Sequence, residues 1–449
     1  LVLVLASFQC GYHIGELNTP KDAITNCPPG TEPPPTLHEL SARAIVSYIR
    51  WVPGHCVPMS DTEYSFVTAA LTLGGLTGSF VAGHWASRWT RQKALRWGLI
   101  CLAIGAIWTS LSDGPGGMAF GRWLSGFGTA VVSVVVPLWL TEIAPADQRG
   151  MIGVMHQLGT VVGILVAQLL GLFLSRPFVW RYILVVPGIL AIAQTFMMSW
   201  CPETRPQLDE HEEESDWRQA GRSARRGSPH RRRRADAPTD ADVDTDVAVA
   251  GPLPRTPRTP RHPHQRPMPS LAASTLLRRP YLRPTIAVLL CLFGQQVSGI
   301  NAVMYYSTPI LSSVMPSQAA LVTVYISIAN LLVTLLAARL ADNTGKRKLL
   351  VVSTFGMSLS SLLLAFSITH GWGILSAALI ILLVVTFGIG LGPVPFLVAA
   401  DLFPPELTGL AQSVGLAANW IGNLIVAVFF LSIRERLGGW TFALFAGIL

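Results

Sequence analysis

Long apolar runs alternate with short polar segments along almost the whole chain. Runs such as 131–140 and 379–392 hold no charged residue, and several neighbouring runs approach the roughly 20 residues that a membrane-spanning helix needs. The pattern predicts an all-α membrane protein with about 12 transmembrane helices in two groups of six. The helices are expected near 1–18, 63–85, 94–112, 117–141, 150–174, 179–201, 284–312, 318–341, 348–369, 373–400, 408–432 and 438–449.

The composition supports a chain surrounded by lipid. Hydrophobic residues make up 51% and charged residues 13%, against roughly a quarter charged in soluble domains. We find no phosphate-binding glycine loop, zinc-spaced Cys/His set or nucleophile elbow, so neither an enzyme nor a cofactor is expected. The net charge of +8 is concentrated in one interior segment and in loops beside apolar runs, which indicates membrane topology and no nucleic-acid partner.

The two groups of helices predict a division into an N-terminal six-helix half at 1–201 and a C-terminal half at 284–449, whose last helix is truncated. The segment 202–283 is rich in Pro and blocks of like charge, so we interpret it as a largely disordered linker. The basic loops 87–96 and 342–348 fall on the same side of the membrane as this linker. That side is predicted to be the cytoplasm.

The richest polar cluster inside a span is GQQVSGINAVMYYS at 294–307. On a regular helix Gln295, Gln296 and Asn301 project around different sides, but Ser298 and Gly299 allow the helix to unwind and turn all three amides toward one cavity. Amides suit a neutral polyhydroxy ligand because each supplies donors and an acceptor without charge. The alternative is that they only bond neighbouring helices.

Other spans add amides and an aromatic ring. Asn419 and Asn423 lie one turn apart with Trp420 beside them, a combination that suits the apolar face and hydroxyls of a sugar. Gln157 and Gln168 are eleven residues apart, which returns to nearly the same helix face. Asn330 is a further candidate, and for Gln157 and Asn330 bonding between helices remains the alternative.

Charged residues in or beside the spans need partners. An unpaired Arg122 at mid-depth would cost roughly 2.5–3.5 kcal/mol, so a partner is predicted. His13, with Glu16 nearby, is a candidate for proton coupling because histidine titrates near neutral pH. Charges at the cytoplasmic ends predict ion pairs that break on inward opening, with ordinary topology charge as the alternative; they are Arg88, Arg91, Glu142, Arg149 and Asp401.

Cysteines are few, and those in or beside apolar runs are expected to be inert. Cys27 and Cys56 share the first long polar loop, which leaves open an external disulfide or two free thiols.

Four segments resemble the sugar-porter branch of the major facilitator superfamily, in particular facilitative glucose transporters and fungal hexose transporters: 149–168, 202–208, 294–311 and 392–403. The resemblance implies a major-facilitator fold with alternating access and the inner ion-pair network. It also implies an outer gate at Tyr305 and Tyr306. The sugar contacts that it implies are Gln157, Gln295, Gln296, Asn301, Asn330, Trp420 and Asn423.

Departures from the family pattern bear on substrate and mechanism. Gly388 and Phe396 stand where the family usually has Glu and Trp, so two sugar contacts are altered, with Phe396 kept as a candidate contact. Proton symporters of this branch resemble GYD in the first helix, whereas this chain reads GYH with His13. Facilitated diffusion of a monosaccharide, a hexose first, is therefore expected.

Two alternatives stay open: a proton-coupled sugar symporter and a sugar sensor that does not transport. The plasma membrane is the expected location, with a vacuolar or other internal membrane as the alternative. The sequence leaves the particular sugar and the oligomeric state open.

Overall fold

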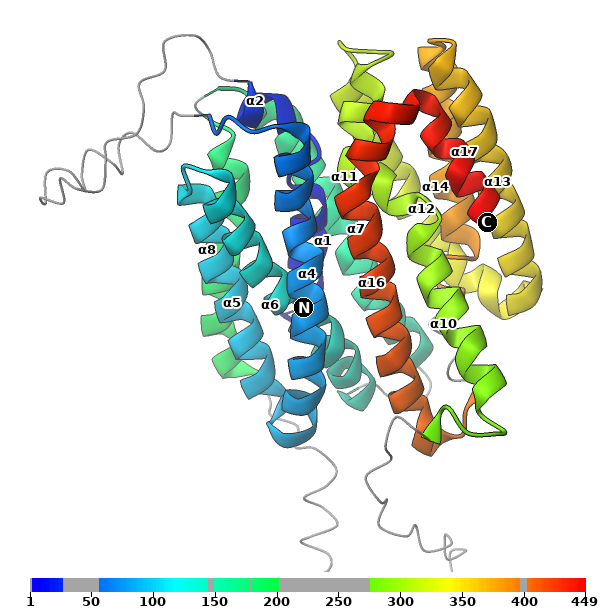
Figure 1. The fold of residues 1–449 in the computed structure, drawn as a ribbon. Coiled ribbons are helices and arrows are strands. Elements are labelled where there is room, and N and C mark those ends of the chain that lie inside the picture. Colours follow the sequence, from blue (N-terminus) through cyan, green and yellow to red (C-terminus); the bar gives the residue numbers. More distant parts are fainter. Residues whose placement is uncertain (1, 27–55, 144–148, 178, 202–274, 396–401) are drawn as a thin grey trace, which may run out of the picture. The chain divides into compact units, whose positions relative to one another are not determined.

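The fold is entirely helical in the part that the computed structural model describes, residues 2–26, 56–143, 149–177, 179–201, 275–395 and 402–449. The N-terminal group comprises α1 (Val2–Gly15), α4 (Asp61–Arg88), α5 (Arg91–Leu111), α6 (Pro115–Ile143), α7 (Arg149–Leu174) and α8 (Arg181–Met197). The C-terminal group comprises α10 (Leu282–Val297), α11 (Ile300–Ser312), α12 (Ala319–Thr344), α13 (Lys346–Thr369), α14 (Gly373–Ile389), α16 (Pro405–Leu437) and α17 (Thr441–Ile448) (Figure 1). The short α2 (Lys21–Thr25) was not expected.

Length and hydropathy make these helices suitable for a bilayer. Within the described ranges, nine segments are long and apolar enough to cross a membrane, and α1 and α14 are shorter apolar helices. Large apolar side chains such as Phe80, Phe196 and Ile374 are exposed on the outside, where lipid would cover them. The all-α membrane fold predicted from the sequence is confirmed.

The predicted helix 284–312 is broken at the expected place. α10 ends at Val297 and α11 begins at Ile300. Between them Gly299 has φ +90°, in the left-handed region that favours glycine. A Cβ there would also lie 2.6 Å from the Phe445 ring. Both the backbone angle and the close contact therefore require glycine at the break.

Two predicted helix ends were wrong. The helix expected to run to residue 400 ends at Ile389, because the chain then turns, with the amides of Gly390 and Gly392 both bonded to the Phe387 carbonyl. The helix expected to stop at residue 432 continues to Leu437 and ends at Gly438, whose φ is +56°. Glycine ends a helix in this way because it adopts positive φ without strain.

Helices of the N-terminal group meet at their backbones. A Cβ on Gly11 of α1 would lie 1.7 Å from the Thr160 carbonyl oxygen of α7, and one on Gly163 of α7 would lie 1.9 Å from the Phe8 carbonyl oxygen of α1. Such distances leave no room for any side chain. Close approach through small residues is typical of membrane helices, and the two contacts hold α1 and α7 together from both sides.

The same reciprocal arrangement joins α4 and α6. A Cβ on Gly74 would lie 1.9 Å from the Trp123 carbonyl oxygen, and one on Gly126 would lie 1.9 Å from the Leu71 carbonyl oxygen. Two helix pairs of the N-terminal group are therefore locked by glycine contacts.

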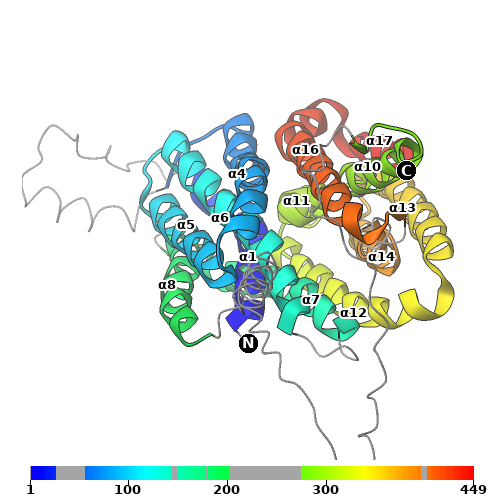
Figure 2. The same ribbon diagram turned by 90° about the horizontal axis from the view of Figure 1, so that it is seen from below.

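The two groups of helices touch along a surface that we call the seam. α4 packs on α16, α7 packs on α12, and α1 contacts α11, and Figure 2 shows the groups side by side. All the described helices belong to one compact unit. Most of the linker predicted at 202–283 lies outside the described residues, so its disorder stays a prediction.

Candidate substrate site at the seam

Gln295 is the hub of a cluster of amides. Its Nε2 donates to the carbonyl oxygens of Leu391 at 2.8 Å and Gly392 at 2.7 Å. Its Oε1 accepts from Asn419 Nδ2 at 2.8 Å and from Gln296 Nε2 at 3.2 Å. A glutamine amide has two N–H groups and two lone pairs, so Gln295 has no hydrogen-bonding capacity left and acts here as a support.

The outer amides of the cluster, on Gln296 and Asn301, keep hydrogen-bond donors that are not used within the described part of the chain. Asn301 donates to Gln296 Oε1 across the break at Gly299. Both side chains are half-buried, and after these bonds each amide keeps an N–H that no other described residue accepts. The structure thus brings Gln295, Gln296 and Asn301 together as the broken helix predicted, with Asn419 as the fourth member of this amide cluster.

Trp420 and Asn423 on α16 present polar atoms without partners. Both side chains are buried, and neither Trp420 Nε1 nor Asn423 Oδ1 has a hydrogen bond within the described residues. The Trp420 ring lies over α4 of the other group, where a Cβ on Gly75 would be 2.5 Å from its Cζ3. A donor and an acceptor therefore lie unused beside the seam, and burying them unbonded costs stability unless a ligand or water bonds them.

Gln168 links the groups through α7 and α12. It is buried, its Oε1 accepts from Ser327 Oγ, and its Nε2 has no partner in the described part of the chain. Gln157 lies on nearly the same face three turns toward Arg149, and it is exposed. Asn330 is buried three residues beyond Ser327. These positions place further amides along the seam.

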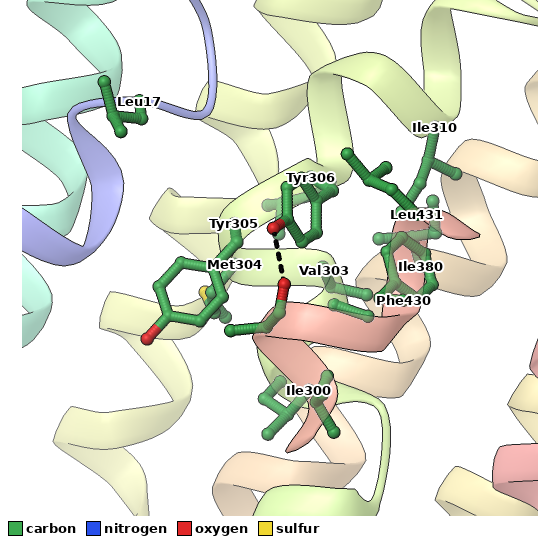
Figure 3. Packing of buried hydrophobic residues seen from close by; sticks show 14 of the residues in the cluster. Leu17, Ile300, Val303, Met304, Tyr305, Tyr306, Ile310, Ile380, Phe430 and Leu431 are labelled. Atoms are coloured by element: carbon green, nitrogen blue, oxygen red, sulfur yellow. Dashed lines mark hydrogen bonds between the residues drawn. The ribbon is translucent and has the colours of Figure 1, made fainter. Parts of the chain in front are cut away.

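Tyr305 and Tyr306, the implied outer gate, are both buried. Figure 3 shows the two rings leaving α11 in different directions. The Tyr306 hydroxyl donates to the Ala427 carbonyl oxygen at 3.0 Å, and its ring stacks on Phe430 with centroids 5.3 Å apart. Both tyrosines are therefore packed inward in this conformation.

Asn18, which no sequence pattern marked, bonds α11 near the two tyrosines. Its Nδ2 donates to the Met304 carbonyl oxygen at 2.8 Å and to Ser307 Oγ at 2.7 Å. Its Oδ1 accepts from the Thr308 amide at 3.0 Å. One side chain beyond α1 thus makes three bonds to α11, and the seam is closed at this end.

The sequence predicts a partner for Arg122, and the structure shows that it is Glu16. Arg122 Nη1 pairs with Glu16 Oε1 and donates to the His13 carbonyl oxygen at 2.7 Å. His13 Nδ1 lies 3.0 Å from the same carboxylate oxygen. All three side chains are at most 2% exposed, so they form a buried charge cluster inside the N-terminal group. His13 Nε2, Glu16 Oε2 and Arg122 Nη2 have no partner among the described residues.

Several predicted positions fall outside the described part. Phe396 and Asp401 lie outside it, as do the side chains of Arg88, Glu142 and Arg149. The inner ion-pair network therefore stays a prediction. Arg91 is described and buried.

Gly388, where the family usually has Glu, packs against α12. A Cβ there would lie 2.3 Å from Val333 Cγ1. This backbone position faces a neighbouring helix, so a larger side chain would require the Val333 side chain to shift.

The expected inertness of the cysteines stays a prediction. Cys10, Cys101, Cys201 and Cys291 are free thiols, and Cys56 is disulfide-bonded. Cys27, which the sequence offers as a possible partner of Cys56, lies outside the described residues.

Comparison with known proteins identifies the family. The model of the family "Sugar (and other) transporter" matches residues 1–449. The chain is 30% identical over its full length to a "probable metabolite transport protein" of Saccharomyces cerevisiae, covering 88% of it. It is 28% identical over its full length to facilitated glucose transporter protein 1 of Caenorhabditis elegans, covering 84% of it. The crystal structure of a D-xylose-proton symporter superposes with a TM-score of 0.71 at 18% identity, covering all of this chain and 94% of that one. The chain is a multi-pass membrane protein that belongs to the sugar transporter family and has the major-facilitator fold.

Proposed function

We propose that this protein moves a monosaccharide, a hexose in the first instance, across a membrane by alternating access between the two groups of helices. The substrate is bound at the seam by Gln296, Asn301, Trp420 and Asn423, with Gln295 holding the amides in place. Gln157, Gln168 and Asn330 extend the polar surface on α7 and α12. No charged group belongs to this set, which suits a neutral polyhydroxy solute.

One observation carries the proposal: Trp420 Nε1 and Asn423 Oδ1 are buried without a partner among the described residues, on the same helix as Asn419, which bonds the saturated Gln295. Unbonded polar groups are costly in a membrane interior. A sugar hydroxyl both donates and accepts, so one ligand can satisfy the indole N–H and the amide oxygen together. Its C–H face would stack on the indole ring.

The direct experiment is uptake by the purified chain in proteoliposomes, with labelled glucose, fructose and xylose. We expect saturable uptake of at least one of them that unlabelled substrate inhibits. Uptake equal to that of empty liposomes for all three sugars, and for a panel of polyols, would contradict the proposal.

The same preparation tests the sensor alternative. A non-transporting sensor binds sugar, measured by a ligand-dependent shift of the thermal unfolding midpoint, but equilibrates none across the bilayer. A transporter gives both signals.

A proton-coupled mode is the second candidate, and the buried charge cluster favours it. The expectation of facilitated diffusion was based on His13 replacing the usual carboxylate of the first helix. Glu16, one turn further on, supplies a carboxylate to the buried Arg122. Glu16 stands directly after α1 and Arg122 lies on α6, so neutralising Glu16 would remove an ion pair that joins these elements.

Uptake at pH 5.5 and 7.5, with and without a protonophore, separates the two modes. In facilitated diffusion the protonophore has no effect, and sugar equilibrates without accumulation. In symport, acid outside drives accumulation that the protonophore abolishes, and Glu16→Gln removes accumulation while exchange of labelled sugar persists.

The membrane that holds the protein is proposed to be the plasma membrane, with a vacuolar or other internal membrane as the alternative. A fluorescent fusion of the full-length protein, imaged against markers of both membranes, distinguishes them.

A further inference from the structure

A cavity of about 550 Å³ lies on the outer side of α5, away from the seam. It is lined by Thr90, Gln92, Lys93, Arg96, Trp97 and Ile100. These residues occupy the first turns of a helix whose preceding loop is predicted to be cytoplasmic. α5 packs on α6 and α8 of its own group, and the cavity belongs to no part of the sugar path proposed above.

Among the described residues, the lining combines two cations with an exposed ring and includes no acidic residue. Lys93 is exposed and Arg96 half-buried. Neither has an ion pair in the part of the chain that the structure describes, and Arg96 Nε is buried there without any hydrogen-bond acceptor. A buried guanidinium N–H lacking an acceptor is costly, so the cavity is short of an anionic or strongly accepting group.

Aromatic residues around the cavity place it at the membrane surface. The Lys93 ammonium lies 4.8 Å over the Trp89 ring, which stacks on Trp85 with centroids 4.6 Å apart. Trp97 is 46% exposed, and Trp200, in the 3-10 turn that follows the neighbouring α8, is 83% exposed. Tryptophan is enriched where headgroups meet the hydrocarbon, and Lys and Arg near such a boundary extend their charged ends to the headgroup layer.

The cavity continues into a lipid-facing stripe. Lys93, Trp97, Ile104, Trp108 and Leu111 are all exposed on α5, and their spacing places them along one side of the helix. A phospholipid with its phosphate in the cavity would thus have its acyl chains lying along an apolar surface. A soluble anion would make the charge contacts but leave this stripe unused.

We propose that this cavity binds the headgroup of an anionic phospholipid of the cytoplasmic leaflet, with Lys93 and Arg96 contacting the phosphate and Trp97 packing on the glycerol region. Gln92 fixes one wall, because its Nε2 donates to the Met198 and Cys201 carbonyl oxygens at the end of α8. Bound lipid would stabilise the α5–α8 corner of the N-terminal group.

The test titrates dioctanoyl phosphatidylserine into the purified full-length chain in detergent and follows the thermal unfolding midpoint, with dioctanoyl phosphatidylcholine as the neutral lipid. A basic residue near the surface contributes about 1 kcal/mol to such binding, which is about a 5-fold change in affinity. Lys93→Gln is therefore expected to weaken phosphatidylserine binding about 5-fold, and Lys93→Gln with Arg96→Gln about 30-fold. Phosphatidylcholine should give little stabilisation to any variant.

The matched control is Arg347→Gln with Lys348→Gln, which removes two exposed cations at the start of α13, outside this cavity. Unchanged phosphatidylserine affinity in the control, with the loss in the α5 variant, supports the site. An equal loss in both would reduce it to general charge attraction and overturn the proposal. Inorganic phosphate tests the source of the ligand: stabilisation by phosphate alone that Lys93→Gln removes would replace the lipid with a free anion. Should the double variant misfold, Lys93→Arg with Arg96→Lys must retain binding.

Discussion

The two groups of helices bury polar side chains in different ways. The N-terminal group holds the buried charge cluster, and the C-terminal group holds the amide cluster. Arg122, Glu16 and His13 bury charge and compensate it by an ion pair. The amides around Gln295 bury only dipoles and bond them to one another and to carbonyl oxygens, which leaves one N–H each on Gln296 and Asn301 for a ligand. An ion pair depends on both partners and on protonation, whereas an amide exchanges one neutral partner for another at little cost. The charged group is therefore suited to a switch and the neutral group to a ligand.

The largest expected effect comes from removing the Arg122 charge from the buried charge cluster. Arg122→Met leaves the Glu16 carboxylate buried without its cation, which costs about 3–5 kcal/mol. We expect a large fall in the thermal unfolding midpoint of the detergent-purified protein. Arg122→Met with Glu16→Gln should recover most of that loss because no charge is stranded. If the single variant were as stable as the double one, the ion pair would not be what stabilises this region.

The next largest effect concerns the break that arranges the amides. Gly299→Ala imposes a left-handed backbone on alanine, about 1–2 kcal/mol, and also drives its Cβ against Phe445, about 1–3 kcal/mol more. Gly371→Ala is the control, because Gly371 also has a positive φ, +72°, and no described atom lies within 4 Å of its Cβ position. The unfolding midpoint should fall for both and clearly further for Gly299→Ala. Equal losses would mean that the Phe445 contact relaxes freely.

Removing the hub should weaken substrate binding more than it destabilises the fold. Gln295→Ala releases Gln296 and Asn419 from their shared acceptor. We expect the binding free energy to weaken by about 1–3 kcal/mol, so that the half-saturation concentration rises about 5- to 150-fold. Gln194→Ala is the control in the N-terminal group, since Gln194 also bonds a buried amide, Gln9, and a carbonyl oxygen. It should lower the unfolding midpoint and leave half-saturation unchanged. Unchanged half-saturation in Gln295→Ala would remove the cluster from the site.

The smallest expected effect isolates a single donor. Trp420→Phe keeps an aromatic ring and deletes the Nε1–H. Binding should weaken by about 0.5–1.5 kcal/mol, which raises the half-saturation concentration about two- to tenfold. Trp180→Phe removes a buried Nε1–H of the N-terminal group that also has no partner among the described residues, and it should leave the half-saturation concentration unchanged. A similar shift in both variants would assign the effect to general packing.

Local rules were enough for the features that depend on one helix. Gly299 predicted the break because only glycine adopts its backbone angle freely, and the isolated Arg122 predicted a buried partner because charge in lipid is costly. The contacts between distant helices were beyond such rules. Neither the three bonds of Asn18 to α11 nor the Gln168–Ser327 bond has a local signal, because spacing along the chain does not say which helix faces which.

Helix ends and the direction of single residues were also harder to predict. Hydropathy continued past Ile389, yet backbone bonding by Gly390 and Gly392 ends the helix there. The sequence predicts a lost sugar contact at Gly388, which stays a prediction, and the structure adds that its Cβ position faces Val333 of α12. Only packing decides between a cavity and a neighbouring helix at such a position.

The glycine contacts of the N-terminal group have a mechanical consequence. Where a carbonyl oxygen occupies the place of a Cβ, as at Gly11 and Gly163, two helices cannot rotate or slide without a collision of backbones. At the seam the contact is softer, a Trp420 ring over Gly75, and rings reorient more easily than backbones. Deformation during a transport cycle would thus be confined to the seam. Side chains at the seam could then set the free-energy barrier between conformations without loosening either helix pair.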